Sequence, residues 1–189
     1  ARPESAWTLT AKGTSVAIVT NGTAVLGLGD IGPLGALPVM EGKSLIFKEF
    51  AGLNAYPLCM NARTPQAVID ATLAIAPGFG GINLEDIAAP DCFQVETELQ
   101  RQLDVPVFHD DQHGTAVVVS AALLNACRIT GRTFPDVRVV LIGCGAAGTA
   151  ISTALLDAGV KDLVIFDKDG VLADREGCLP HHRVLAERS

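Results

Sequence analysis

Short apolar runs alternate with longer stretches of mixed polarity along this chain, and this alternation predicts strands followed by helices. Residues 44–50 fit a helix or a strand equally well. The runs expected to form strands are residues 15–20, 56–60, 79–84, 105–109, 137–142 and 163–166, and the stretches expected to form helices are residues 64–76, 89–103, 114–131 and 146–158. Such repetition of strand and helix is typical of an α/β protein with a parallel sheet.

Two of the expected helices carry clear local signals. Thr64 and Pro65 provide an N-cap and a first-turn proline for the helix at 64–76. The helix at 114–131 is apolar on almost every side, so we expect it to be buried and to link two lobes. We therefore predict two domains, residues 1–113 and residues 114–189.

Composition narrows the possible partners and the location. The formal net charge of −7, without a cluster of Lys or Arg, argues against nucleic-acid binding. No apolar run approaches the ~18 residues of a membrane helix, and the first residues do not resemble a secretory signal. The five cysteines are scattered and form no C-x-x-C pair, which predicts reduced thiols and a cytoplasmic location without membrane contact.

Two pairs of adjacent acids, Glu85-Asp86 and Asp110-Asp111, follow two consecutive expected strands. The carboxyl ends of neighbouring parallel strands lie side by side, so the four carboxylates should meet at one rim of the sheet. Oxygen ligands without cysteine favour a hard cation, Mg²⁺ or Mn²⁺. The alternative is that Asp86 and Asp111 cap the helices that follow.

Nearby histidines and lysines leave further alternatives open. His109 and His113 flank the second acid pair, either as ligands or in a supporting or packing role. Lys43 follows a glycine; beside a metal in a dry cleft its pKa would fall and it could act as a base. Spacing alone does not separate Lys43 from Lys12 or Lys48, and an exposed lysine is the simpler reading.

A G-x-G-x-x-G segment, Gly143-Cys-Gly145-Ala146-Ala147-Gly148, joins an expected strand to an expected helix. Asp167 follows at the end of the next strand, which completes the context of a dinucleotide-binding loop. An acid at this position accepts hydrogen bonds from a ribose diol and repels a 2′-phosphate, so NAD is favoured, whereas the adjacent Lys168 keeps NADP possible. The alternative is a glycine-rich turn that binds no ligand.

Five segments together resemble the malic enzymes, most closely their short bacterial form. They are residues 21–33 (NGTAVLGLGDIGP), 38–43 (PVMEGK), 80–87 (GGINLEDI), 107–116 (VFHDDQHGTA) and 143–148 (GCGAAG). The resemblance runs from about Trp7 to the last residue and corresponds to the central portion of such an enzyme. It implies a parallel-sheet N-terminal domain that binds malate and metal, followed by an incomplete Rossmann-type dinucleotide-binding domain.

The resemblance also implies an activity and a role for each site residue. The activity is oxidative decarboxylation of L-malate to pyruvate and CO₂ with NAD(P) and Mg²⁺ or Mn²⁺. By resemblance, the metal ligands are Glu85, Asp86 and Asp111, the base is Lys43, and Asp110 assists that base. The residues that would hold the cofactor are Thr115, Gly143, Gly145, Ala146, Ala147 and Gly148, with Asp167 at its adenosine ribose.

The chain departs from the family pattern in one respect that bears on activity. The family's general acid is a tyrosine in a Tyr-Thr-Pro-Gly-Val type motif, and Tyr56, the single tyrosine here, is not in such a motif. We therefore expect this chain alone to be weakly active or inactive, and we expect a homodimer or higher homo-oligomer. The alternatives are a non-catalytic module that binds NAD or metal, and another NAD-linked 2-hydroxy-acid oxidoreductase.

Overall fold

The computed structural model describes residues 2–172 and 180–187. The chain divides into two compact units, Ala1–Asp110 and Asp111–Ser189. The domain boundary after residue 113 stays a prediction.

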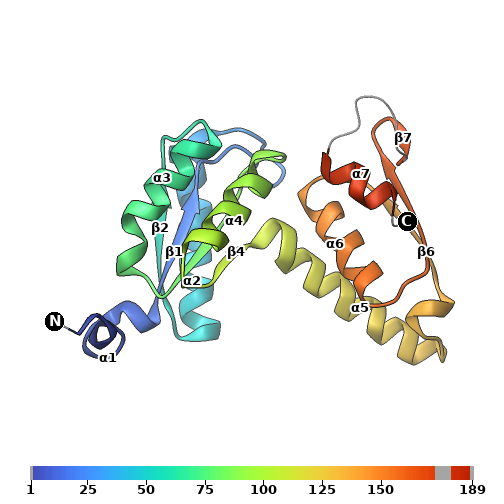
Figure 1. The fold of residues 1–189 in the computed structure, drawn as a ribbon, viewed down its shortest axis with the longest axis horizontal. Coiled ribbons are helices and arrows are strands. Elements are labelled where there is room, and N and C mark those ends of the chain that lie inside the picture. Colours follow the sequence, from blue (N-terminus) through green and yellow to red (C-terminus); the bar gives the residue numbers. More distant parts are fainter. Residues whose placement is uncertain (1, 173–179, 188–189) are drawn as a thin grey trace. The chain divides into compact units, whose positions relative to one another are not determined.

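The first unit is built on a four-stranded parallel sheet (Figure 1). Its strands are β1 (Ser15–Thr20), β2 (Asn54–Cys59), β3 (Gly81–Leu84) and β4 (Val107–His109), in the order β2-β1-β3-β4. All neighbours pair in parallel. Three short helical turns precede β1: η1 (Pro3–Ser5), α1 (Ala6–Leu9) and η2 (Ala11–Thr14). The predicted parallel sheet is therefore confirmed, and β3 and β4 are neighbours whose carboxyl ends meet at one rim.

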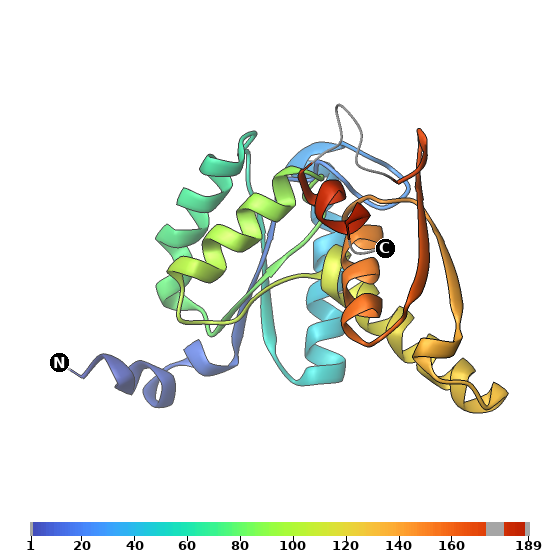
Figure 2. The ribbon, with the colours of Figure 1, turned by 45° about the vertical axis from the view of Figure 1, so that its right-hand side comes forward.

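Helices cover both faces of this sheet (Figure 2). Helix α2 (Gly32–Ala51) packs on one face, where Ile18, Met40 and Ala55 form a buried apolar cluster. Helices α3 (Pro65–Ile75) and α4 (Asp91–Gln102) lie side by side on the other face, with η3 (Ala76–Gly78) following α3. The predicted start of α3 is confirmed, because Thr64 Oγ1 accepts a hydrogen bond from the backbone N–H of Ala67 at 3.2 Å.

Both edges of this sheet are protected from further pairing. On β4, the outward carbonyl of Val107 accepts a hydrogen bond from Gln100 Nε2 at 3.1 Å, and the outward N–H of His109 donates to Glu96 Oε1 at 3.0 Å. On β2, alternate residues face β1, and the residue that faces outward near the middle is Pro57, which has no N–H to offer. A row of unsatisfied backbone groups is thereby avoided.

The second unit begins within the π-helical turn η4 (Asp110–Gly114), which leads into helix α5 (Thr115–Thr130). The further elements are η5 (Phe134–Asp136), β5 (Arg138–Ile142), α6 (Ala146–Asp157), β6 (Asp162–Asp167), β7 (Gly170–Val171) and α7 (Pro180–Ala186). Strands β5 and β6 are parallel, and the short β7 pairs antiparallel to β6. The β5–α6–β6 segment is the βαβ unit expected at the start of a Rossmann-type domain.

One prediction of burial is wrong. Helix α5 is not buried: Val117 and Val118 are each 63% exposed and Ile129 is 86% exposed. Strand β5 only partly buries Val139 and Leu141, which pack against the apolar core of this unit, while Val140 is 62% and Ile142 87% exposed. Apolar composition indicates which side chains favour burial, but it does not supply the layer that would cover them. None of the helices in the described residues is long and apolar enough to cross a membrane.

Candidate metal and cofactor sites

Three of the predicted metal ligands lie together at the rim of the first sheet. Glu85 and Asp86 follow β3, and Asp111 comes two residues after the end of β4. One carboxylate oxygen from each lies within 4.8 Å of those of the other two. The helix-capping alternative is wrong, because α4 begins after Pro90 and α5 after Gly114, and neither helix has a side-chain cap.

The donor atoms and the burial of this cluster fit a hard divalent cation. Glu85 is 8% exposed and Asp86 4%, and burial raises the pKa of Glu85. The hydrogen bond from Asn83 Nδ2, 2.9 Å from Glu85 Oε2, and the nearby Lys43 oppose this shift without cancelling it. A buried pair of neighbouring acids is costly to keep ionised, and oxygen donors of this kind suit Mg²⁺ or Mn²⁺.

Lys43, on α2, lies against the same cluster. Its Nζ is 3.0 Å from Glu85 Oε2 and 2.8 Å from Asp110 Oδ2. Burial lowers the pKa of Lys43, but the hydrogen bond to Asp110 and the charge of Glu85 outweigh it, so the net shift is upward. The lowered pKa expected from sequence is therefore not found in this arrangement, because two carboxylates stabilise the ammonium form.

The structure distinguishes Lys43 from Lys12 and Lys48, which sequence spacing could not do for the role of the base. Lys12 Nζ donates to the carbonyls of Pro77 at 2.9 Å and Phe79 at 2.6 Å, at the opposite end of the strands. Lys48 Nζ donates to Asn54 Oδ1 at the start of β2. Of these three lysines, Lys43 is the one whose amine contacts the acids.

The histidines and the tyrosine lie outside this ligand set. His109 is fully buried as the last residue of β4, and the three-carboxylate cluster includes neither His109 nor His113. Tyr56 pairs with Ala17 near the start of β1, and its ring contacts Phe79 at a centroid distance of 6.0 Å. The chain's single tyrosine is thus near the amino ends of the strands, away from the rim that carries the acids.

Asn83 is a site residue that sequence reasoning missed. It lies two positions before Glu85, so both side chains project from the same face of the strand. That spacing was the available signal. The amide is 4% exposed and holds one oxygen of the Glu85 carboxylate.

The predicted dinucleotide loop joins β5 to α6, and each of its three glycines has a separate role. Gly143 has a φ of 104°, a conformation that favours glycine. A Cβ on Gly148 would lie 2.0 Å from the carbonyl oxygen of Gly143, so this close approach requires glycine. A Cβ on Gly145 would meet nothing within 4 Å, which leaves open space beside the loop for an approaching phosphate.

The other predicted cofactor residues lie at the ends of neighbouring elements. Ala146 and Ala147 form the first turn of α6, where free backbone N–H groups and the helix dipole favour an anion. Thr115 begins α5, and Asp167 ends β6. Asp167 Oδ1 accepts a hydrogen bond from the backbone N–H of Asp169 at 2.7 Å, which fixes the orientation of its carboxylate.

Comparisons with known proteins cover both units. Residues 4–71 match the family model "Malic enzyme, N-terminal domain", and residues 112–186 match "Malic enzyme, NAD binding domain". The chain is 55% identical, over 90% of its length, to an NAD-dependent malic enzyme of Geobacillus stearothermophilus, of which it covers 36%. It is 49% identical, over 90% of its length, to an NADP-dependent malic enzyme of Halomonas elongata, of which it covers 41%.

A solved structure gives the same result. The chain superposes on the crystal structure of the NAD-dependent malic enzyme of Thermotoga maritima with a TM-score of 0.95 and 48% identity, covering 99% of this chain and 50% of that one. The chain thus spans between about a third and a half of the length of these relatives. With family models matching in both units, the chain belongs to the malic enzyme family.

Proposed function

We propose that the protein carrying this chain oxidises and decarboxylates L-malate to pyruvate and CO₂, reduces NAD(P)⁺, and requires Mg²⁺ or Mn²⁺. The observation that carries this proposal is the contact of Lys43 Nζ with Glu85 Oε2 at 3.0 Å and Asp110 Oδ2 at 2.8 Å. An amine, a proton acceptor beside it and a set of cation ligands thereby meet at the carboxyl ends of β3 and β4. Membership of the malic enzyme family supports the same activity.

Glu85, Asp86 and Asp111 would hold the cation. A bound Mg²⁺ or Mn²⁺ would supply positive charge that acidifies the C2 hydroxyl of malate and stabilises negative charge on that oxygen later in the reaction. Asn83 would keep Glu85 in place through its hydrogen bond to Oε2.

Lys43 would take the proton of the C2 hydroxyl while the C2 hydrogen leaves as hydride to the nicotinamide ring. The C3–C4 bond then breaks, its electron pair forms the enolate of pyruvate, and the C4 carboxylate departs as CO₂. Return of one proton to C3 gives pyruvate. The balance is L-malate and NAD(P)⁺ to pyruvate, CO₂ and NAD(P)H.

Lys43 acts as a base only after it has lost its own proton. Its pKa is raised while Glu85 and Asp110 both face it, so the neutral amine is disfavoured in this arrangement. A divalent charge near Glu85 would oppose the ammonium and favour the neutral amine. Asp110, which accepts a hydrogen bond from Lys43 at 2.8 Å, would assist the base by holding its amine in place.

The nicotinamide cofactor would lie along the loop from Gly143 to Gly148, with Thr115 beside it and its adenosine ribose at Asp167. The carboxylate of Asp167 favours NAD because it repels a 2′-phosphate. NADP is the alternative, since Lys168 adjoins this acid and its side chain is 89% exposed.

Self-association and a cytoplasmic location complete the proposal. Leu26, Leu34 and Phe50, in the glycine-rich loop and along α2, are 94%, 85% and 88% exposed. Large apolar side chains in such numbers favour contact with another surface, and a homodimer or higher homo-oligomer would provide it. The thiols of Cys59, Cys92, Cys127 and Cys144 are free, which supports a reducing compartment such as the cytoplasm.

The position of Tyr56 favours a second candidate, a non-catalytic module that binds NAD or metal. With the single tyrosine of this chain near the amino ends of the strands, protonation at C3 has no phenol available at the acid cluster. We therefore expect the isolated chain to turn over slowly or not at all.

The test is formation of NADH from L-malate and NAD⁺ with Mn²⁺, with NADP⁺ in parallel. Turnover that disappears on chelation supports the malic enzyme reaction. Tight binding of Mn²⁺ and NADH without turnover by this chain supports the non-catalytic candidate for the chain itself. Absence of Mn²⁺ binding would contradict the cation site.

A further inference from the structure

Asp86 has an unusual backbone conformation. Its φ is +53°, and among the described residues it is the only one other than glycine with a positive φ. Aspartate enters this left-handed region more readily than most residues, and contacts in the folded protein can hold it there. Asp86 is 4% exposed, so those contacts come from the protein.

The glycine-rich loop after β1 supplies these contacts. The carbonyl of Asp86 accepts hydrogen bonds from the backbone N–H groups of Thr23 at 3.1 Å and Ala24 at 3.0 Å. Two residues after Asp86, the N–H of Ala88 donates to Thr23 Oγ1 at 3.0 Å. The turn at residues 86–88 is therefore tied to Thr23 at two points, the Asp86 carbonyl and the Ala88 N–H.

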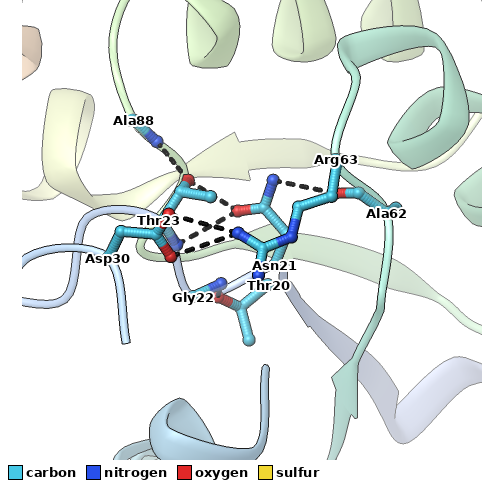
Figure 3. A network of polar contacts seen from close by, with 8 residues as sticks. All are labelled: Thr20, Asn21, Gly22, Thr23, Asp30, Ala62, Arg63 and Ala88. Carbon is cyan, nitrogen blue, oxygen red and sulfur yellow. Dashed lines mark hydrogen bonds and ion pairs between the residues drawn. The ribbon is translucent and has the colours of Figure 1, made fainter. Parts of the chain in front are cut away.

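The hydroxyl of Thr23 is also held by a hydrogen bond to Asn21, as Figure 3 shows. Thr23 Oγ1 donates to Asn21 Oδ1 at 2.7 Å, and Asn21 Nδ2 donates to the carbonyl of Ala62 at 3.2 Å. Asn21 is 5% exposed and follows directly on β1. The Thr23 hydroxyl thus connects Asn21, at the end of a central strand, to Ala88 in the turn that carries Asp86.

The base of the loop is also closed by backbone hydrogen bonds. The Gly22 carbonyl accepts hydrogen bonds from the N–H groups of Ile31 at 3.1 Å and Gly32 at 3.0 Å. A Cβ on Gly22 would lie 2.3 Å from the carbonyl oxygen of Gly32, so the two ends of the loop are in close contact. Thr23 therefore projects from a closed and fixed segment.

We propose that Thr23 is a positioning residue that imposes the left-handed turn at Asp86 and thereby aims its carboxylate at Glu85 and Asp111. This inference rests on the proposed cation site. Thr23 touches no reacting atom in this proposal; it acts through the Asp86 carbonyl and the Ala88 N–H. Residues that orient ligands in this indirect way typically change metal affinity by about 10- to 100-fold when replaced.

The test is Mn²⁺ affinity, measured by electron paramagnetic resonance on wild type, Thr23→Val and Thr23→Ser. Valine keeps the shape of threonine and removes both hydroxyl bonds, whereas serine keeps the hydroxyl. We expect Thr23→Val to weaken Mn²⁺ binding about tenfold and Thr23→Ser to bind as wild type. Equal affinity of wild type and Thr23→Val, or equal weakening by valine and serine, would overturn the inference.

Arg63→Gln is the matched control within the same loop network. Arg63 Nη1 pairs with Asp30 at 3.1 Å, and both side chains are more than half exposed, but neither is bonded to residues 86–88. Its replacement should leave Mn²⁺ affinity unchanged. A loss as large as that of Thr23→Val would assign the effect to the loop as a whole and overturn the role of Thr23.

Two further measurements separate the possible failures. If Thr23→Val does not fold, amide hydrogen exchange of the wild type is the test. The Ala88 amide should be protected from exchange, and Mg²⁺ should increase that protection. Exchange of this amide at the rate of an open loop would overturn the inference. If Asp111→Asn weakens Mn²⁺ binding and Thr23→Val does not, the cation site stands and only the role of Thr23 falls. Absence of Mn²⁺ binding by wild type overturns both.

Discussion

The carboxylate of Glu96 accepts a hydrogen bond from the backbone N–H of His109 at 3.0 Å, although the two residues lie on different elements, α4 and β4. Glu96 is 5% exposed and His109 is fully buried. One helical turn later, Gln100 satisfies the carbonyl of Val107. The side chains of Glu96 and Gln100 thus make the hydrogen bonds that a further strand would make with β4. They hold the end of β4 immediately before Asp110.

Replacement of Glu96 should therefore destabilise the first unit. Glu96→Ala leaves the buried N–H of His109 without its acceptor and should cost about 1–3 kcal/mol of unfolding free energy. Glu96→Gln keeps an oxygen acceptor and should cost less. Urea denaturation of both variants checks this, and an alanine variant as stable as the glutamine variant would contradict it.

Asp111→Asn should weaken Mn²⁺ binding by more than about tenfold, because loss of a direct ligand should exceed the effect of losing an outer partner. Asp70→Asn, on the exposed face of α3, is the control that removes one negative charge far from the cluster. Isothermal titration with Mn²⁺ measures both. Unchanged affinity in Asp111→Asn would remove Asp111 from the ligand set.

The stability of the metal-free protein should depend on pH through Glu85. Its pKa in the folded state is raised above the ordinary value of 4.5, so the folded state binds this proton more tightly than the unfolded state. The resulting stabilisation is fully present below 4.5 and is lost as pH rises through the folded pKa. The pKa of Lys43 is also raised, so the stability that Lys43 contributes is lost only at alkaline pH. It therefore does not affect the pH range in which Glu85 loses its proton.

Glu85→Gln should remove this pH dependence. The free energy of unfolding of wild type and variant is measured with urea in the presence of chelator, from acidic to neutral pH. As pH rises, the wild type should lose stability relative to Glu85→Gln. Parallel pH profiles for the two proteins would contradict the raised pKa of Glu85. With Mn²⁺ present, only wild type should gain stability, because ligand binding to the folded state stabilises it.

The two glycines Gly145 and Gly148 should respond differently to alanine. Gly145→Ala adds a Cβ to open space, so it should leave thermal stability nearly unchanged while it weakens NADH binding. Gly148→Ala forces a Cβ to within 2.0 Å of the Gly143 carbonyl, so it should lower both stability and NADH binding. NADH fluorescence and thermal unfolding separate the two effects, and equal thermal stability of the two variants would contradict this assignment.

Asp167 should govern the choice between the two nicotinamide cofactors. Asp167→Ser removes the charge that repels a 2′-phosphate, so the ratio of NADPH to NADH affinity should rise by about tenfold, the factor for a difference of about 1.4 kcal/mol. Asp169→Ser, two residues further on, is the control that removes a neighbouring acid. A similar change in both variants would mean that general charge, and not contact with the ribose, sets the preference.

Sequence was a good guide where the signal is local. The N-cap at Thr64, the strand at Ser15–Thr20 and the acid pairs after β3 and β4 were all predicted from neighbouring residues. The start of α2 was not, since Gly32, Pro33 and Gly35 are weak helix formers and this helix is held by packing of its buried face on β1 and β2.

Contacts between distant residues explain most of what sequence reasoning missed. Thr23 and Ala88 are separated by 65 positions, and Glu96 and His109 belong to different elements, so no spacing rule connects them. The exposure of α5 was missed for another reason. A polar face would indicate which side of a helix is exposed to solvent, and a helix that is apolar on almost every side has none. The net direction of the Lys43 pKa shift likewise depends on two distant carboxylates, Glu85 directly after β3 and Asp110 directly after β4.

The protected edges of the first sheet have a consequence for how this protein can misassemble. With Glu96 and Gln100 occupying the outer side of β4, and Pro57 interrupting the outer side of β2, a strand from another molecule finds no continuous ladder to extend. Strand exchange and fibril growth from the β4 edge would first require α4 to detach. The resistance of the first unit to β-aggregation therefore depends on a helix, and its loss should follow the melting of α4.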